Sequence, residues 1–138
     1  MAEQWHFNPE METLSRAELD ALQVQRLRRS VVRSMQAPIY RDGAFAGKLD
    51  PETITSIDDI RRLPFTTKDD LRANGPFAYL TVPLSEIVRI HSSSGTTGTA
   101  VSIFHTSDDL ANWTELVARC MAAVGLSKED VFQNIAGY

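Results

Sequence analysis

The stretch His91-Ser92-Ser93-Ser94-Gly95-Thr96-Thr97-Gly98-Thr99 carries more chemical information than any other part of this sequence. Three serines, three threonines and two glycines follow His91 in these nine positions, between strand-like stretches at 87–90 and 100–104. Glycine allows positive φ angles and a close approach of the backbone to a ligand. Successive backbone N–H groups in such a turn form a concave anion site, and short hydroxyl side chains add donors beside it. The composition therefore favours a loop that binds a polyphosphate.

The same stretch also suits a plain connecting loop, whereas two familiar nucleotide-binding motifs do not match it. Clusters of Ser, Thr and Gly are typical of ordinary connections between elements. A P-loop is excluded because Gly95 and Gly98 are only three positions apart and no lysine follows them. The dinucleotide fingerprint is excluded as well, since G-x-G-x-x-G is absent and a strand-like rather than a helical segment follows.

Length and composition indicate an ordinary globular chain. Its 138 residues fit one domain of common size, with 43% hydrophobic and 23% charged residues. The formal net charge of −4 argues against nucleic acid, whose binding depends on basic surfaces. No apolar run is long enough to cross a membrane, and the first residues lack the pattern of a secretory signal. We therefore expect a cytoplasmic protein without nucleic-acid or membrane partners.

Several polar and reactive residues have a simple structural role. The single Cys120 has no partner for a disulfide or a metal site and lies in a helical apolar pattern, so we expect a buried thiol. Asp108 and Asp109 are accounted for by the start of a helix, where carboxylates favour the dipole, rather than by metal binding. The basic run fits a solvated helix face; it comprises Arg26, Arg28, Arg29 and Arg33.

The first half of the chain is expected to be helical with irregular connections. Ser15 and Glu18 form a capping box for a helix that ends near Gln36, and Pro38 stops it. Residues 37–55 are rich in turn formers and predict an irregular connection. A short helical turn follows at 56–60, and a second capping box begins a helix over 68–73. One apolar stripe faces the core of the first helix; it comprises Leu19, Leu22, Leu27, Val31 and Met35.

The second half predicts strands on both sides of the loop and a long helix. Strands near 87–91 and 100–105 are too close in sequence for a parallel crossover, so we expect an antiparallel hairpin. Ser107 is expected to cap a helix that ends at Gly125, and 131–135 has the pattern of another strand. The expected core face of this helix comprises Leu110, Trp113, Val117, Met121 and Val124. This order predicts an α/β fold, the opening part of a larger and incomplete layer domain. Its exposed strand edge favours self-association or a homodimer.

Four segments together resemble a known family. They are 62–72 (Arg-Leu-Pro-Phe-Thr-Thr-Lys-Asp-Asp-Leu-Arg), 88–91 (Val-Arg-Ile-His), 92–98 (Ser-Ser-Ser-Gly-Thr-Thr-Gly) and 112–120 (Asn-Trp-Thr-Glu-Leu-Val-Ala-Arg-Cys). In this order they resemble the phenylacetate–CoA ligases, a branch of the adenylate-forming acyl-CoA synthetases. The resemblance covers nearly the whole chain. Because members of the family are several times longer, it implies that this sequence corresponds to their N-terminal portion only.

The resemblance implies an activity, its cofactors and a division of the chain. A carboxylate attacks ATP with the help of Mg²⁺ to give an acyl-adenylate, and the thiol of CoA then forms a thioester. Residues 1–55 correspond to an N-terminal helical region, and 56–138 to the start of the adenylation domain with its phosphate loop at 92–99. No catalytic residue and no metal ligand falls in this portion. The residues matched to ATP phosphate binding are Ser93, Ser94, Gly95, Thr96, Thr97, Gly98 and Thr99.

The chain departs from the family pattern at three positions. Thr99 stands where many relatives have lysine, which predicts weaker binding of phosphate, and Ala100 stands where proline often follows. The family often reads Tyr-Gly-Tyr-Gly along its acid pocket, whereas this chain reads Ala136-Gly137-Tyr138. These three residues are matched to the acid pocket. The substrate implied is an aromatic or related carboxylic acid, with phenylacetate itself in question.

Two interpretations of the whole chain stay open at this point. One is the N-terminal part of an acid–CoA ligase, inactive on its own because the rest of the ATP site would lie after Tyr138. The other is a stand-alone module of the same fold that binds phosphate or a partner chain without catalysis. Of the remaining candidates, His91 is expected to be a packed or capping residue. Trp113 is expected to be a core residue rather than a pocket wall, and Lys68 is expected to face solvent.

Overall fold

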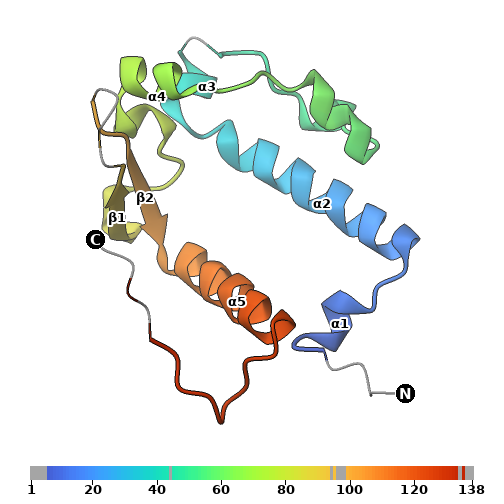
Figure 1. Cartoon of the computed structure of the whole chain (residues 1–138). Helices are drawn as coiled ribbons and strands as arrows, with labels where there is room; N and C mark the ends of the chain where they lie inside the picture. The colour runs from blue at the N-terminus through green and yellow to red at the C-terminus, as the bar shows by residue number, and fades with distance from the viewer. Residues whose placement is uncertain (1–5, 44, 94, 96–98, 134, 136–138) are drawn as a thin grey trace.

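The structure, a computed structural model, describes residues 6–43, 45–93, 95, 99–133 and 135. Two long helices, α2 (Arg16–Ser34) and α5 (Ser107–Ala123), lie on different sides of the molecule (Figure 1). The other helical segments are α1 (Pro9–Glu12), α3 (Pro38–Arg41), η1 (Pro51–Thr53), η2 (Ile57–Arg62), α4 (Lys68–Asn74), η3 (Pro76–Tyr79) and η4 (Leu84–Glu86). The strands are β1 (Ile87–Ser92) and β2 (Ser102–Thr106). No helix in the described ranges is long and apolar enough to cross a membrane.

Four helical segments begin with the same local device, a reciprocal capping box. The hydroxyl of a Ser or Thr lies beside the backbone N–H of the residue three positions later. The carboxylate of that later residue accepts hydrogen bonds from the Ser or Thr. The pairs are Ser15/Glu18, Ser56/Asp59, Thr67/Asp70 and Thr106/Asp109. The predicted boxes at Ser15 and Thr67 are confirmed. For α5, the prediction that Ser107 is the cap is wrong by one residue, because Asp109 lies three positions after Thr106.

The core lies where the end of α2 meets the segment that follows it. Val31, Ala37, Ile39 and Ile54 are each less than 5% exposed. Nε of Arg28 donates to the Ile54 carbonyl at 2.6 Å, which ties the segment to the helix. The expectation of a wholly irregular connection over 37–55 is wrong, since it contains α3 and η1. Both begin with a proline at their first position, which favours a helix start.

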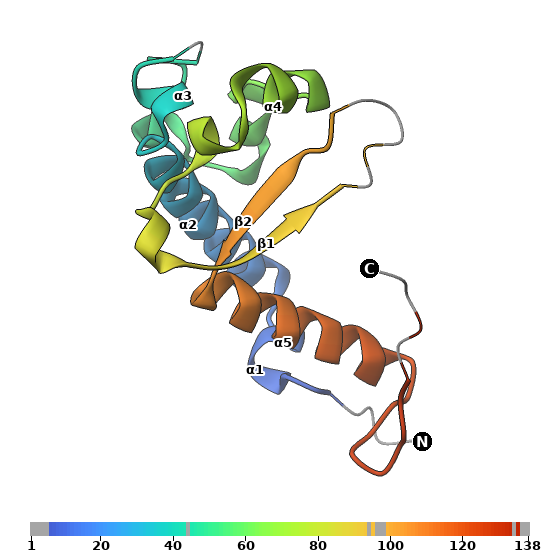
Figure 2. The same cartoon turned by 90° about the vertical axis from the view of Figure 1, so that its left-hand side faces the viewer.

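The strands β1 and β2 form the expected antiparallel hairpin. Arg89 pairs with His105, Ile90 with Phe104, and Ser92 with Ser102, with a register shift between Ile87 and Arg89. The strand β2 runs directly into α5, so the residues that flank the loop lie at the opposite end of the hairpin from this helix (Figure 2).

Polar contacts join the two ends of the helical arrangement. Nδ2 of Asn8 donates to the Glu115 carboxylate at 2.9 Å, and Glu12 lies 3.2 Å from Nε of Arg119. In Figure 1, α1 accordingly lies beside the far end of α5. These contacts connect α1 and its N-cap residue to α5.

Several expected core positions are exposed instead. Cys120 is exposed, so the prediction of a buried thiol is wrong. Val117 and Val124 on the expected core face of α5 are 40% and 80% exposed. No strand forms at 131–133, and Val131 is fully exposed, so the predicted strand at 131–135 is wrong over its described residues. All of these groups share one cause: no neighbouring element among the described residues covers them.

Candidate functional site

Ser93 and Val101 close the base of the loop with two reciprocal hydrogen bonds. The Ser93 N–H donates to the Val101 carbonyl at 2.9 Å. The Val101 N–H donates to Oγ of Ser93, also at 2.9 Å. We call this pair the loop neck. Because Oγ of Ser93 acts as the acceptor here, its hydroxyl hydrogen remains able to donate to a ligand.

Two of the expected phosphate-loop residues, Gly95 and Thr99, have a described conformation or contact. Gly95 has a φ of +69°, in the left-handed region where a side chain is strained. Thr99 is exposed, and its carbonyl accepts a hydrogen bond from Nε of Arg72 at 3.2 Å. The other expected phosphate residues, Ser94, Thr96, Thr97 and Gly98, lie outside the described residues. So do the expected acid-pocket residues Ala136, Gly137 and Tyr138.

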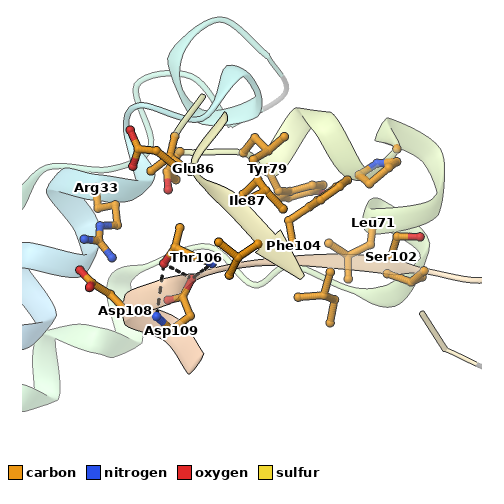
Figure 3. A pocket seen from close by; sticks show the side chains of 18 of the residues that line it. Arg33, Leu71, Tyr79, Glu86, Ile87, Ser102, Phe104, Thr106, Asp108 and Asp109 are labelled. Atoms are coloured by element: carbon orange, nitrogen blue, oxygen red, sulfur yellow. Dashed lines mark hydrogen bonds between the residues drawn. The ribbon is translucent and has the colours of Figure 1, made fainter. Parts of the chain in front are cut away.

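A pocket of about 800 Å³ lies along one face of the hairpin (Figure 3). Its wall combines parts of α4, η3, both strands and the start of α5. Arg72, Thr99 and Ala100 line one part of it, so the pocket reaches the exit of the loop. Leu71, Tyr79, Ile87 and Phe104 supply apolar and aromatic side chains between its two ends.

The opposite end of this pocket is charged. Asp108 and Asp109 of α5 lie there near Arg33 of α2 and Glu86 of η4 (Figure 3). The Thr106 N–H donates to the Asp109 carboxylate at 2.9 Å, and this bond is the main cause that lowers the pKa of Asp109. Asp109 therefore completes a helix cap, as expected for the start of a helix, and it stays ionised at neutral pH.

The other face of the hairpin carries an aromatic cluster. The ring of His91 lies 5.0 Å from that of His105 and 5.2 Å from that of Trp113, measured between centroids. His105 and Trp113 are 5.6 Å apart. The expectation that His91 is a packing residue is confirmed. Trp113 packs on both imidazoles yet is 44% exposed, so the prediction that it is a core residue is wrong.

Three further points concern metal binding, Lys68 and Arg72. In the described ranges, no group of three or more His, Cys, Asp or Glu side chains is arranged to hold a metal ion. Lys68 is exposed at the start of α4, as expected. Arg72 was missed by sequence reasoning, although it lies in one of the four segments that carry the family resemblance. Its contact with Thr99 joins residues 27 positions apart, and nothing in the local pattern indicates it.

Comparison with known proteins connects this arrangement to one family of ligases. The chain is 41% identical over 129 residues to a phenylacetate-coenzyme A ligase of Escherichia coli strain K12. It is 41% identical over 133 residues to the phenylacetate-coenzyme A ligase of Thermus thermophilus. These alignments cover 93% and 96% of this chain. The resemblance to the phenylacetate–CoA ligases is confirmed. The chain spans about 30% of the length of these relatives, and no family model matches it.

Solved structures show the same fold. A 2-hydroxyisobutyryl-CoA ligase in complex with 2-HIB-AMP and CoA matches 88% of this chain with a TM-score of 0.73 at 32% identity. An open conformation of this ligase matches 91% of the chain with a TM-score of 0.75. This chain covers 27% and 28% of those two structures. The expected α/β fold, an incomplete part of a CoA-ligase domain, is therefore confirmed, whereas the division at 55/56 stays a prediction.

Proposed function

We propose that the chain is the N-terminal, phosphate-binding part of an ATP-dependent acid–CoA ligase. The observation that carries the proposal is the glycine- and hydroxyl-rich loop held at its neck by Ser93 and Val101, in a chain 41% identical to two such ligases. In the proposed reaction an acid carboxylate attacks the α-phosphate of ATP and displaces pyrophosphate. The thiol of CoA then attacks the acyl carbon of the adenylate and displaces AMP.

The role proposed for the loop is to hold the β- and γ-phosphates while pyrophosphate leaves. Negative charge grows on the leaving group, and donors that are already oriented stabilise it without further reorganisation. The positive φ of Gly95 gives the backbone a turn that an L side chain opposes. Short hydroxyl side chains provide further donors. No described residue is assigned a covalent or proton-transfer step.

The remaining components of the reaction belong to the same proposal. The substrate is a small aromatic or related carboxylic acid, and Mg²⁺ enters bound to ATP rather than to a cluster of carboxylates in this part of the chain. The solved relatives hold an acyl-AMP and CoA, which supports ATP and CoA as co-substrates. A cytoplasmic location stays a prediction. The stand-alone, non-catalytic module remains without a supporting observation.

The experiment is a chimera in which this chain replaces the 133 matching residues of the Thermus thermophilus ligase. We expect acid-dependent exchange of labelled pyrophosphate into ATP by the chimera. Holding ATP and acid together supplies much of the rate of such a reaction, so we expect no exchange by the 138-residue chain alone. Exchange by the chain alone would contradict its expected inactivity. A folded chimera that binds no ATP would overturn the proposed function.

A glycine substitution tests the loop itself. Gly95→Ala in the chimera should lower the exchange rate by about tenfold or more, because a side chain at positive φ distorts the turn. Gly47→Ala is the matched control, since Gly47 has the same φ of +69° and open space around it. Its conformational strain is comparable, but it lies far from the loop in sequence. Equal loss of exchange in both variants would show that strain alone, and not the phosphate site, accounts for the effect.

A further inference from the structure

The helix α4 presents Arg72 to the exit of the loop. The Thr67/Asp70 capping box begins this helix, and Gly75 ends it with a φ of +72°. Both ends are therefore defined by local hydrogen bonds and backbone conformation. Arg72 lies in the last turn with a side chain only 23% exposed. An arginine side chain held in this way is a suitable element to constrain a neighbouring segment.

Two contacts of Arg72 lie within the part of the chain that the structure describes. Its Nε donates to the Thr99 carbonyl at 3.2 Å, and its Nη1 lies 3.1 Å from Oδ1 of Asp69. The first contact crosses from α4 to the loop exit, and the second stays within α4. The side chain of Asp69 is 90% exposed, so solvent weakens this ion pair. Of these two described contacts, the bond to Thr99 is the one that reaches outside the helix.

The bond from Arg72 to the Thr99 carbonyl fixes the orientation of a whole peptide unit. The Thr99 carbonyl and the Ala100 N–H belong to one planar peptide unit and point in opposite directions when that unit is trans. Orienting the carbonyl toward Arg72 therefore orients the Ala100 N–H away from it. The next residue, Val101, is held at the loop neck by Ser93. Two independent contacts thus define the course of the backbone over 99–101.

We propose that Arg72 is a positioning residue of the phosphate loop. It holds the Thr99–Ala100 peptide unit so that the loop leaves the site in one orientation, and its effect on ATP passes through this backbone. The functional part of this inference rests on the proposed function, whereas the structural part does not. A loop whose end is already held loses less conformational entropy when it binds a ligand. The bond between Arg72 and Thr99 therefore favours binding of phosphate by the loop.

The identity of the side chain matters to this role. The planar guanidinium donates from Nε and from Nη1 in separate, fixed directions, which lets it reach Thr99 and Asp69 at once. A lysine at the same position has one nitrogen at the end of a flexible stem. Arg72→Lys therefore keeps the charge but loses the geometry. The two properties can be separated by experiment.

Hydrogen exchange at the Val101 amide of the 138-residue chain tests the structural part. Arg72→Gln and Arg72→Lys should both speed this exchange by about tenfold, the effect of losing one charge-assisted hydrogen bond. Asp69→Asn is the matched control, since it removes the ion pair but leaves the bond to Thr99; we expect less than about a twofold change. Exchange of the α4 amides shows in each variant that the helix is intact. Unchanged Val101 exchange in both Arg72 variants would overturn the proposal.

Steady-state kinetics of the chimera test the functional part. Arg72→Lys should raise KM for ATP about tenfold and leave KM for the acid unchanged, because only the phosphate loop is affected. Full activity of Arg72→Lys together with loss in Arg72→Gln would assign a purely electrostatic role and overturn positioning. If the unsubstituted chimera binds no ATP, the proposed function fails. Hydrogen exchange at the Val101 amide then still decides whether Arg72 positions the loop.

Discussion

Asp59 is a carboxylate whose hydrogen-bond and ion-pair partners favour its charged form. It is only 7% exposed and accepts hydrogen bonds from the Ser56 and Thr55 N–H groups at 2.8 and 2.7 Å. Arg62 lies 3.1 Å away and adds an opposite charge. Together, with the Ser56 N–H as the largest cause, these groups lower the pKa of Asp59 from 3.8 to about 2. The residue fixes the start of η2 and requires an ionised carboxylate to do so.

Acid should therefore weaken the fold through Asp59. A carboxylate with a lowered pKa in the folded state stabilises that state fully above its unfolded pKa of 3.8, and this contribution is lost as pH falls toward about 2. We expect the free energy of unfolding to decrease over this interval. Asp59→Asn should be less stable at neutral pH and show a shallower decrease in acid. Urea unfolding at several pH values measures both. Parallel pH profiles of the two proteins would contradict this prediction.

At the scale of elements, the start of α5 is defined by the Thr106/Asp109 capping box. The Thr106 hydroxyl oxygen accepts a hydrogen bond from the Asp109 N–H at 3.2 Å. The same hydroxyl donates to the Asp109 carboxylate at 2.8 Å. Thr106→Ala should lower the free energy of unfolding by about 1 kcal/mol, the usual effect of losing an N-cap. The control is Thr114→Ala, because the Thr114 hydroxyl bonds the Leu110 carbonyl within the same helix and contributes little. Denaturant unfolding followed by circular dichroism compares the two. Equal losses would contradict the capping role.

Local devices of this kind were largely predictable from the sequence, and long-range ones were not. The Ser15 and Thr67 boxes follow from two residues three positions apart. The same pattern occurs at Thr106 and Asp109. Ser107, the residue after Thr106, is also a type that favours the N-cap position, which accounts for the error of one residue. The hairpin followed from the short spacing of two strands around a loop. In contrast, the contact between Arg72 and Thr99 depends on how α4 lies against the hairpin, which no local pattern encodes.

The failed predictions share a different cause. The pattern at 131–135 suits a strand, but a strand requires a neighbour for its backbone groups, and none lies beside its described residues. Cys120 and Val124 follow a helical apolar pattern, yet pattern alone does not state which element covers a face. The phosphate site was predicted chiefly from glycines and hydroxyls. The structure describes Ser93, Gly95 and Thr99 of this site, and the role of every one of its residues in phosphate binding stays a prediction.

At the scale of the whole molecule, the amount of exposed surface stands out. The accessible area is 10643 Å², whereas a compact monomer of this mass exposes about 7,200 Å². Several of the exposed large apolar side chains lie on α5 and the segment after it. Leu116, Val117 and Val124 at this helix are all at least 40% exposed, and Val131 beyond it is fully exposed. Exposed apolar side chains near one another along a helix favour association with another protein surface.

We accordingly predict that the 138-residue chain self-associates as its concentration rises. Burying Leu116 and Val117 against a second copy removes apolar area from water, which stabilises the associated form. Leu116→Lys combined with Val117→Lys should shift the chain toward the monomer in sedimentation velocity, because two buried charges oppose association. Thr114→Lys together with Ala111→Lys adds the same charge at exposed positions of α5 without removing large apolar side chains, so it separates charge repulsion from apolar contact. A monomer at every concentration, or equal effects of both double variants, would show that this face does not drive association.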